Sequence, residues 1–294
     1  MFWAMVATLA LGLACSVMSI VVILRGWSFL GEGISHAGFG GVGTAFVLSL
    51  LVPGLRDSQP AFAVAAVFCL VTAMAIARLS RGSIAPSGSS AAGGSIGSDA
   101  AIGVFVAASL AWGFVAFQWY AQGSGKGVAS WELYLFGSVD DVTRVDALAS
   151  VCVSAAVMLI VALLGRQVLL YCLDPTMAQV SGVAVGMIHY LLFGLLALVV
   201  IATMWLVGNL LAPALLVLPG ATALSLSRRL KTVMLLSTGA GGGSVLAGML
   251  IHGHWTFLPP GPAIVLVNFL LLLAARAWVA ILTRRGAGAI GSVS

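Results

Sequence analysis

Two ionisable residues, Glu32 and His36, lie four positions apart within an otherwise apolar stretch of the chain. In a helix this spacing places both side chains on one face, where they can reach one ion together. A carboxylate oxygen and an imidazole nitrogen suit Zn²⁺, Mn²⁺ or Fe²⁺ better than Ca²⁺ or Mg²⁺. Two ligands do not complete a coordination sphere, so water, another helix or a second copy of the chain must supply the rest. The alternative is a structural hydrogen bond that fixes one helix against another.

A second pair of histidines, His252 and His254, forms an H-x-H motif at the end of another apolar stretch. On an extended loop, such a pair could capture a metal ion on its way into the membrane. The sequence favours the alternative, an interfacial histidine beside Trp255, because aromatic side chains gather at membrane surfaces.

The segment that begins at Asn209 carries two prolines, Pro213 and Pro219, six residues apart. Each lacks a backbone N–H and is expected to kink a helix, which lipid tolerates only where the freed carbonyls are buried or face a cavity. Broken helices are common at transport sites. The three residues are therefore candidates for a gating element.

The composition determines which class of protein carries these residues. Of the 294 residues, 61% are hydrophobic and 7% are charged, and the mean hydropathy is +1.16. Soluble domains average roughly 45–50% apolar and about 25% charged residues. The composition excludes a soluble enzyme, a nucleic-acid-binding module and a disordered chain. It indicates an all-α, polytopic transmembrane bundle in the lipid bilayer, a single domain over residues 1–294 with no nucleic-acid partner.

Nine apolar segments are long enough, or nearly so, to cross a bilayer, which takes about 20 residues. They cover residues 3–24, 28–52, 60–77, 100–120, 146–165, 186–207, 209–226, 232–251 and 261–283. The count falls to eight if the two segments beside Gly208 form one broken element. We favour nine.

Basic residues predict the orientation, because cytoplasmic loops are enriched in Lys and Arg. With nine spans, one side collects nine basic residues and the other only three, namely Arg56, Lys126 and Arg144. This distribution predicts an N-terminus outside and a cytoplasmic C-terminus.

Two of the predicted cytoplasmic connections differ in character. Residues 79–99 are rich in Ser, Gly and Ala and predict a flexible loop. Residues 172–184 predict a short structured element, because Asp174 is a good N-cap, Pro175 suits the first helical position and Gly182 follows the helix. Such a helix could dock another subunit or lie at the interface as an ordinary helix, and its spacing does not separate the two.

The segment 28–52 is also rich in glycine, with six between positions 31 and 43. Small residues let helices approach closely in lipid. This density beside Glu32 and His36 suggests a helix that lines a passage.

Five blocks of sequence between residues 25 and 262 follow the pattern of one transporter family. They are RGWSFLGEGISHA (25–37), SDAAIG (98–103), YLFGS (134–138), VGNLLAPALL with PGATA (207–223) and LPPGP (258–262). Together they resemble the ABC-3 family of metal-transporter permeases, the zinc, manganese and iron type. The stretch DPTMAQVSG (174–182) is similar to the element on which the family docks its ATPase.

The resemblance implies a permease subunit of the bacterial inner membrane that forms a homodimer. It also implies two cytoplasmic ATPase subunits and an extracytoplasmic metal-binding protein as partners. By position, Glu32 and His36 would coordinate metal in the pathway, with Glu32 standing where the family usually has Asp. Coupling to the ATPase would fall to Asp174, Pro175, Ala178 and Gly182.

We therefore expect a permease, and not an enzyme, that moves Zn²⁺, Mn²⁺ or Fe²⁺, with import as the favoured direction. No cofactor is expected to stay bound, and the sequence lacks a Walker A motif, so ATP belongs to the partner subunit. A proton-coupled secondary carrier would use the same pair. A less favoured alternative is an intramembrane metalloenzyme with Glu32 as base and His36 as ligand, although the HExxH motif is absent from the sequence.

Overall fold

The computed structural model describes residues 2–51, 58–80, 98–124, 142–209, 211–255 and 257–290, and every regular element in these ranges is a helix. The prediction of an all-α chain is confirmed. In chain order the helices are α1 (Phe2–Leu24), α2 (Leu30–Leu51), α3 (Ser58–Ser80), α4 (Ser98–Ser124), α6 (Arg144–Leu163), α7 (Gly165–Leu173), α8 (Pro175–Val180), α9 (Val185–Val207), α10 (Leu211–Leu226), α11 (Leu230–His254) and α12 (Pro260–Ile290).

Eight of the helices in the described ranges are long and apolar enough to cross a membrane. The remaining predicted segment, 209–226, forms α10, which has 16 residues. At a rise of 1.5 Å per residue such a helix is about 24 Å long, short of a hydrocarbon core of roughly 30 Å. The favoured count of nine is therefore corrected to eight full-length spans and one shorter helix.

Two sequence features fall partly or wholly outside the described residues. The predicted flexible loop is not described from residue 81 to 97, and its two ends belong to α3 and α4. The block YLFGS at 134–138 also lies outside. The orientation of the termini stays a prediction.

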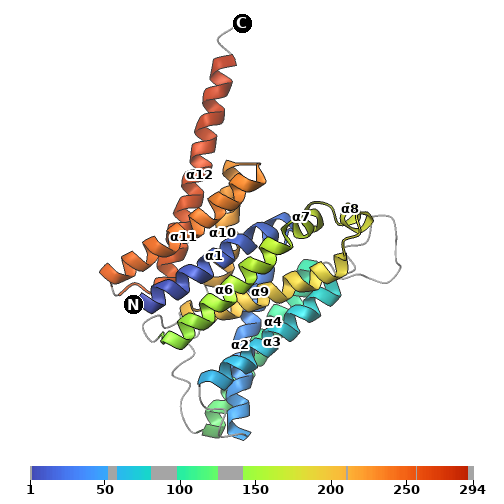
Figure 1. Ribbon diagram of the computed structural model, residues 1–294. Coiled ribbons are helices and arrows are strands. Elements are labelled where there is room, and N and C mark those ends of the chain that lie inside the picture. Colours follow the sequence, from blue (N-terminus) through green and yellow to red (C-terminus); the bar gives the residue numbers. More distant parts are fainter. Residues whose placement is uncertain are drawn as a thin grey trace.

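The helices form two groups that meet along α9 and α10 (Figure 1). In the first group α2 packs against both α3 and α4, and α9 lies against α3. In the second, α1 packs against α6, α10 and α11, and α12 lies on α10 and α11. Because α9 and α10 each contact α1 and α2, they connect the groups. The short helices α7 and α8 lie at the end of the bundle where α9 begins (Figure 1).

The glycines of α2 allow neighbouring helices to approach closely. A Cβ atom at Gly41 would lie 2.8 Å from the Cα of Ala65 on α3, and one at Gly40 would lie 2.9 Å from the carbonyl oxygen of Ser109 on α4. Such approaches between backbones need small residues. These positions serve helix packing, and the lining of a passage by this helix stays a prediction.

Candidate functional site

Over residues 30–43, the accessible part of α2 is a narrow polar strip. Between residues 30 and 43, all of them described, Glu32 and His36 are the positions that are not buried. The Glu32 side chain is 49% exposed and that of His36 is 21% exposed. We call these two residues the α2 pair. Over this stretch α2 is otherwise enclosed by its neighbours, and it presents one carboxylate and one imidazole at the surface of the chain.

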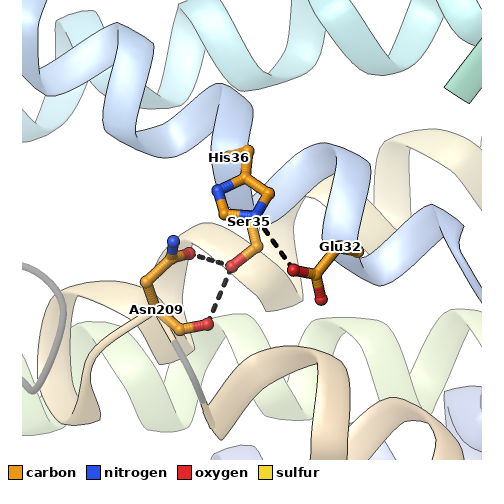
Figure 2. A network of polar contacts seen from close by, with 4 residues as sticks. All are labelled: Glu32, Ser35, His36 and Asn209. Carbon is orange, nitrogen blue, oxygen red and sulfur yellow. Dashed lines mark hydrogen bonds and ion pairs between the residues drawn. The ribbon is translucent and has the colours of Figure 1, made fainter. Parts of the chain in front are cut away.

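The side chains of the α2 pair meet directly (Figure 2). Nε2 of His36 lies 2.9 Å from Oε1 of Glu32, and Nδ1 of His36 is buried without a hydrogen-bond partner. Two ligand atoms on one transition-metal ion, each about 2.1 Å from it, lie about 3.0–3.4 Å apart. The spacing of the pair is close to that value, so an ion could replace the proton shared between nitrogen and oxygen after a small adjustment.

No group of three or more His, Cys, Asp or Glu residues that could hold a metal ion occurs in the described ranges. The α2 pair is therefore an open, two-ligand arrangement and not a closed structural metal site, which would normally take four protein ligands. An incomplete coordination sphere suits an ion that must leave the site again.

Contacts with α9 give the depth of the pair within the bundle. The ring of Trp27, which precedes α2, lies 4.8 Å from that of Phe193 near the start of α9. At the other end, a Cβ at Gly38 would collide with the sulfur of Met204 near the end of α9. The α2 pair falls between these levels, and Glu32 lies in the first turn of α2. Ionisable groups within membrane-spanning segments are costly and usually mark a functional pathway.

Asn209 lies where the chain breaks between α9 and α10. Gly208 ends α9 with φ of 97°, a backbone conformation that favours glycine. The Ser35 hydroxyl donates to the backbone carbonyl of Asn209 at 2.9 Å and also contacts its Oδ1 (Figure 2). The predicted helix break is present, and it is tied to α2 by the residue next to His36.

The two prolines of α10 have different effects. Pro213 lies in the first turn of α10, where a backbone N–H has no intrahelical acceptor. The expectation that it removes a helical hydrogen bond is therefore wrong. Pro219 is inside the helix and does remove one. Next to it, the N–H of Gly220 donates to Oγ of Ser19 on α1 at 2.9 Å.

The predicted short element forms α8, and its capping residues are those that the sequence predicts. Oδ1 of Asp174 accepts from the backbone N–H groups of Thr176 and Met177, at 2.8 and 3.0 Å, and Pro175 is the first helical residue. Gly182 ends the element with φ of 80°. The hydrogen bonds around Gly182 form a Schellman motif.

One face of α8 is buried and the other is open. Ala178 is fully buried, whereas Met177 and Val180 are 61% and 80% exposed. Two accessible apolar side chains therefore lie on a short helix that is capped at both ends.

The pair His252 and His254 is built differently from the loop that the sequence suggests. Helix α11 continues through His254, and residues two positions apart on a helix point about 160° away from each other. His252 is 6% exposed and its Nδ1 lies 2.8 Å from the carbonyl of Leu258, while His254 is exposed beside Trp255. The structure does not bring the two imidazoles together.

Comparison with known proteins determines the class of this membrane protein. The model of the ABC 3 transport family matches residues 1–279. The chain belongs to the ABC 3 transport family. This ABC-3 protein is thus a multi-pass protein of the bacterial cytoplasmic membrane, a permease subunit whose ATPase is a separate chain.

Relatives of this ABC-3 protein cover nearly the whole chain. The manganese transport system membrane protein MntC of Halalkalibacterium halodurans is 35% identical over 273 residues, 92% of this chain and 85% of that protein. The manganese import system permease protein ScaB of Streptococcus gordonii is 32% identical over 92% of this chain and 88% of its own length. The chelated iron transport system membrane protein YfeD of Yersinia pestis is 29% identical, with coverages of 92% and 83%.

A solved structure shows the same fold. The chain superposes on one in the complex of PsaBC from Streptococcus pneumoniae with a Fab, with a TM-score of 0.73 and 30% sequence identity. The match covers 92% of this ABC-3 chain and 89% of the other chain.

Sequence reasoning missed two polar contacts of this ABC-3 protein. The bond between Ser35 and Asn209 joins residues 174 positions apart, which no local pattern reveals. His189, near the start of α9, is only 1% exposed and is hydrogen-bonded within the bundle. Only the packing of α7 over α9 shows its burial.

Proposed function

We propose that this ABC-3 permease moves a divalent transition-metal ion past the α2 pair, driven by ATP hydrolysis on its partner subunits. The observation that carries the proposal is the strip on α2, where a carboxylate and an imidazole 2.9 Å apart are the accessible groups of the otherwise buried stretch 30–43. Both are ligands for Mn²⁺, Fe²⁺ and Zn²⁺. The relatives named for manganese and iron make the first two ions the favoured cargo.

We further propose that a second copy of the chain completes the pathway. Because the strip is open to the outside of one chain, two copies that face each other along α2 would bring two carboxylates and two imidazoles to one ion. Four such ligands match the coordination of the candidate metals better than two do.

We propose that the direction of transport is import. With the N-terminus outside, α8 lies on the cytoplasmic side and His252 and His254 lie at the outer end of α11. An extracytoplasmic metal-binding protein would deliver the ion there, with the exposed His254 met first. Import is also the direction in the printed name of the ScaB relative.

The proposal is tested in proteoliposomes that contain the chain together with its ATPase subunits. Uptake of Mn²⁺ should require ATP and should be inhibited by competing Fe²⁺, as measured with a metal-sensitive dye inside the vesicles. Uptake that persists without ATP but follows a pH gradient would favour the proton-coupled carrier. Metal-dependent turnover of a substrate without any metal crossing the membrane would favour the metalloenzyme.

The proposed docking role of α8, with Asp174, Pro175, Ala178 and Gly182 as its framework, makes a separate prediction. Val180→Asp should reduce co-purification of the ATPase by at least about tenfold, because the charge is placed at the centre of an apolar contact. Val180 is 80% exposed, so the change should leave the fold of the permease intact. Val180→Thr, similar in shape and uncharged, is the matched control. Equal ATPase recovery with both variants would contradict docking through α8.

A further inference from the structure

A polar and aromatic cluster joins four parts of the chain at the end of the bundle that holds α8. We call Arg25, Trp27, Tyr171 and His189 the aromatic clamp. The Tyr171 hydroxyl lies 2.7 Å from Nδ1 of His189, and Nε2 of His189 lies 2.9 Å from the carbonyl oxygen of Ala77 on α3. A carbonyl only accepts, so Nε2 carries the proton and Nδ1 accepts from the tyrosine. One imidazole thereby connects α7, α9 and α3.

The other two members of the aromatic clamp lie between α1 and α2. The guanidinium carbon of Arg25 lies 4.4 Å from the ring centroid of Tyr171 and 5.3 Å from that of Trp27. The ring of Trp27 lies 5.6 Å from that of His189. Burial raises the pKa of Tyr171 to about 12, with Arg25 acting in the opposite direction, so the hydroxyl keeps its proton and donates at any physiological pH.

The aromatic clamp is continuous with α8 on one side and with the α2 pair on the other. Only Asp174 separates α7, which carries Tyr171, from α8. On the other side, the carbonyl of Trp27 accepts the N–H of Leu30, the first residue of α2, at 2.9 Å. Glu32 follows two residues later. An unbroken set of packed groups therefore runs from the exposed face of α8 to the polar strip of α2.

We propose that the aromatic clamp transmits movement of α8 to the α2 pair, with Tyr171 and His189 as positioning residues that make α7, α9 and the start of α2 move as one body. This inference rests on the proposed ATP-driven transport. Its physical basis is that the hydrogen bonds of the clamp are buried. Separating Tyr171 from His189 would leave a donor and an acceptor unpaired in apolar surroundings, which costs more than the bond itself contributes.

Tyr171→Phe tests the inference because it keeps the ring and removes only the hydroxyl. In proteoliposomes with the ATPase subunits, ATP hydrolysis and Mn²⁺ uptake are measured together with the melting temperature of the complex. The ions moved per ATP should fall by about fivefold, within the range over which single residues change coupling. The rate of ATP hydrolysis should stay near that of the unmodified complex, while the melting temperature falls because Nδ1 of His189 loses its buried donor.

Tyr120→Phe is the matched control, because Tyr120 stacks on Phe46 of α2, 4.9 Å away, far along the helix from the aromatic clamp. Its ratio of ions to ATP should be unchanged. His189→Gln supplies an independent variant, since it keeps a donor towards Ala77 and removes the acceptor for Tyr171. If Tyr171→Phe does not assemble, His189→Gln carries the test alone.

An unchanged ratio in these clamp variants would overturn the inference. So would a parallel fall in hydrolysis, uptake and melting temperature, which indicates a merely structural role. If the unmodified complex itself moves no metal with ATP, the proposed function fails, and that outcome is distinct from a failure of the clamp.

Discussion

Replacing His36 with alanine is expected to lower metal uptake at least about a hundredfold, because even indirect partners of metal ligands cost 10–100-fold when removed. His36 is one of the two candidate protein ligands on α2. Its loss therefore halves the number of ligands that each chain can contribute to the ion. Folding should be retained. The imidazole lies in the accessible strip, and its Nδ1 makes no hydrogen bond whose partner would be left unpaired. The Glu32 carboxylate is exposed enough to be solvated by water once it loses the hydrogen bond to His36.

Uptake of radioactive manganese by cells that lack their own transporters measures this effect, with the amount of permease in the membrane quantified by immunoblot. Thr44→Val is a suitable control on the same helix, because Thr44 bonds to Gly40 and Trp112 away from the α2 pair. Normal uptake by the His36→Ala variant at normal membrane levels would rule out His36 as a ligand.

Gly41→Val is expected to destabilise the permease by about 3 kcal/mol, the upper end of the usual cost of overpacking. A Cβ at this position would lie 2.8 Å from the Cα of Ala65 and 3.0 Å from the Cβ of Phe68. Both atoms belong to the rigid part of α3 and cannot rotate away, so α2 and α3 must separate. The detergent-solubilised protein should then melt at a lower temperature and be recovered in smaller amounts.

Gly103→Val is the matched control for this prediction. Gly103 lies on the exposed side of α4, and a Cβ there would meet nothing within 4 Å. The same change in size should therefore leave the melting temperature nearly unchanged. An equal fall in melting temperature for the two variants would contradict the prediction. It would show that stability depends on the loss of a glycine at either position, and not on the contact between α2 and α3.

The sequence predicts those parts of this molecule that depend on local signals. Hydropathy predicts the spans, and the N-cap Asp174 with Pro175 and Gly182 predicts α8 almost to the residue. Spacing alone places Glu32 and His36 on one face, because the period of a helix determines which side chains are neighbours. These features require no knowledge of which helix lies beside which.

Features that depend on tertiary packing are not predictable in this way. The burial of His189 arises when α7 folds over α9, and the partner of Ser35 is a helix break far along the chain. The different roles of Pro213 and Pro219 depend on where α10 begins, and that boundary is determined by the break at Gly208. Hydropathy covers both prolines with one apolar segment and does not separate them.

The enclosure of α2 also bears on how metal preference could evolve. At the buried positions from Leu30 to Val42, a larger side chain would collide with α3, α4, α9 or α10, so selection for folding restricts them severely. Positions 32 and 36 are free of this restriction because they face outward. An exchange between Glu and Asp at position 32 changes the reach of the carboxylate without disturbing any helix contact. Under the proposed transport past the α2 pair, selectivity for the ion can therefore drift by single substitutions while the architecture stays constant.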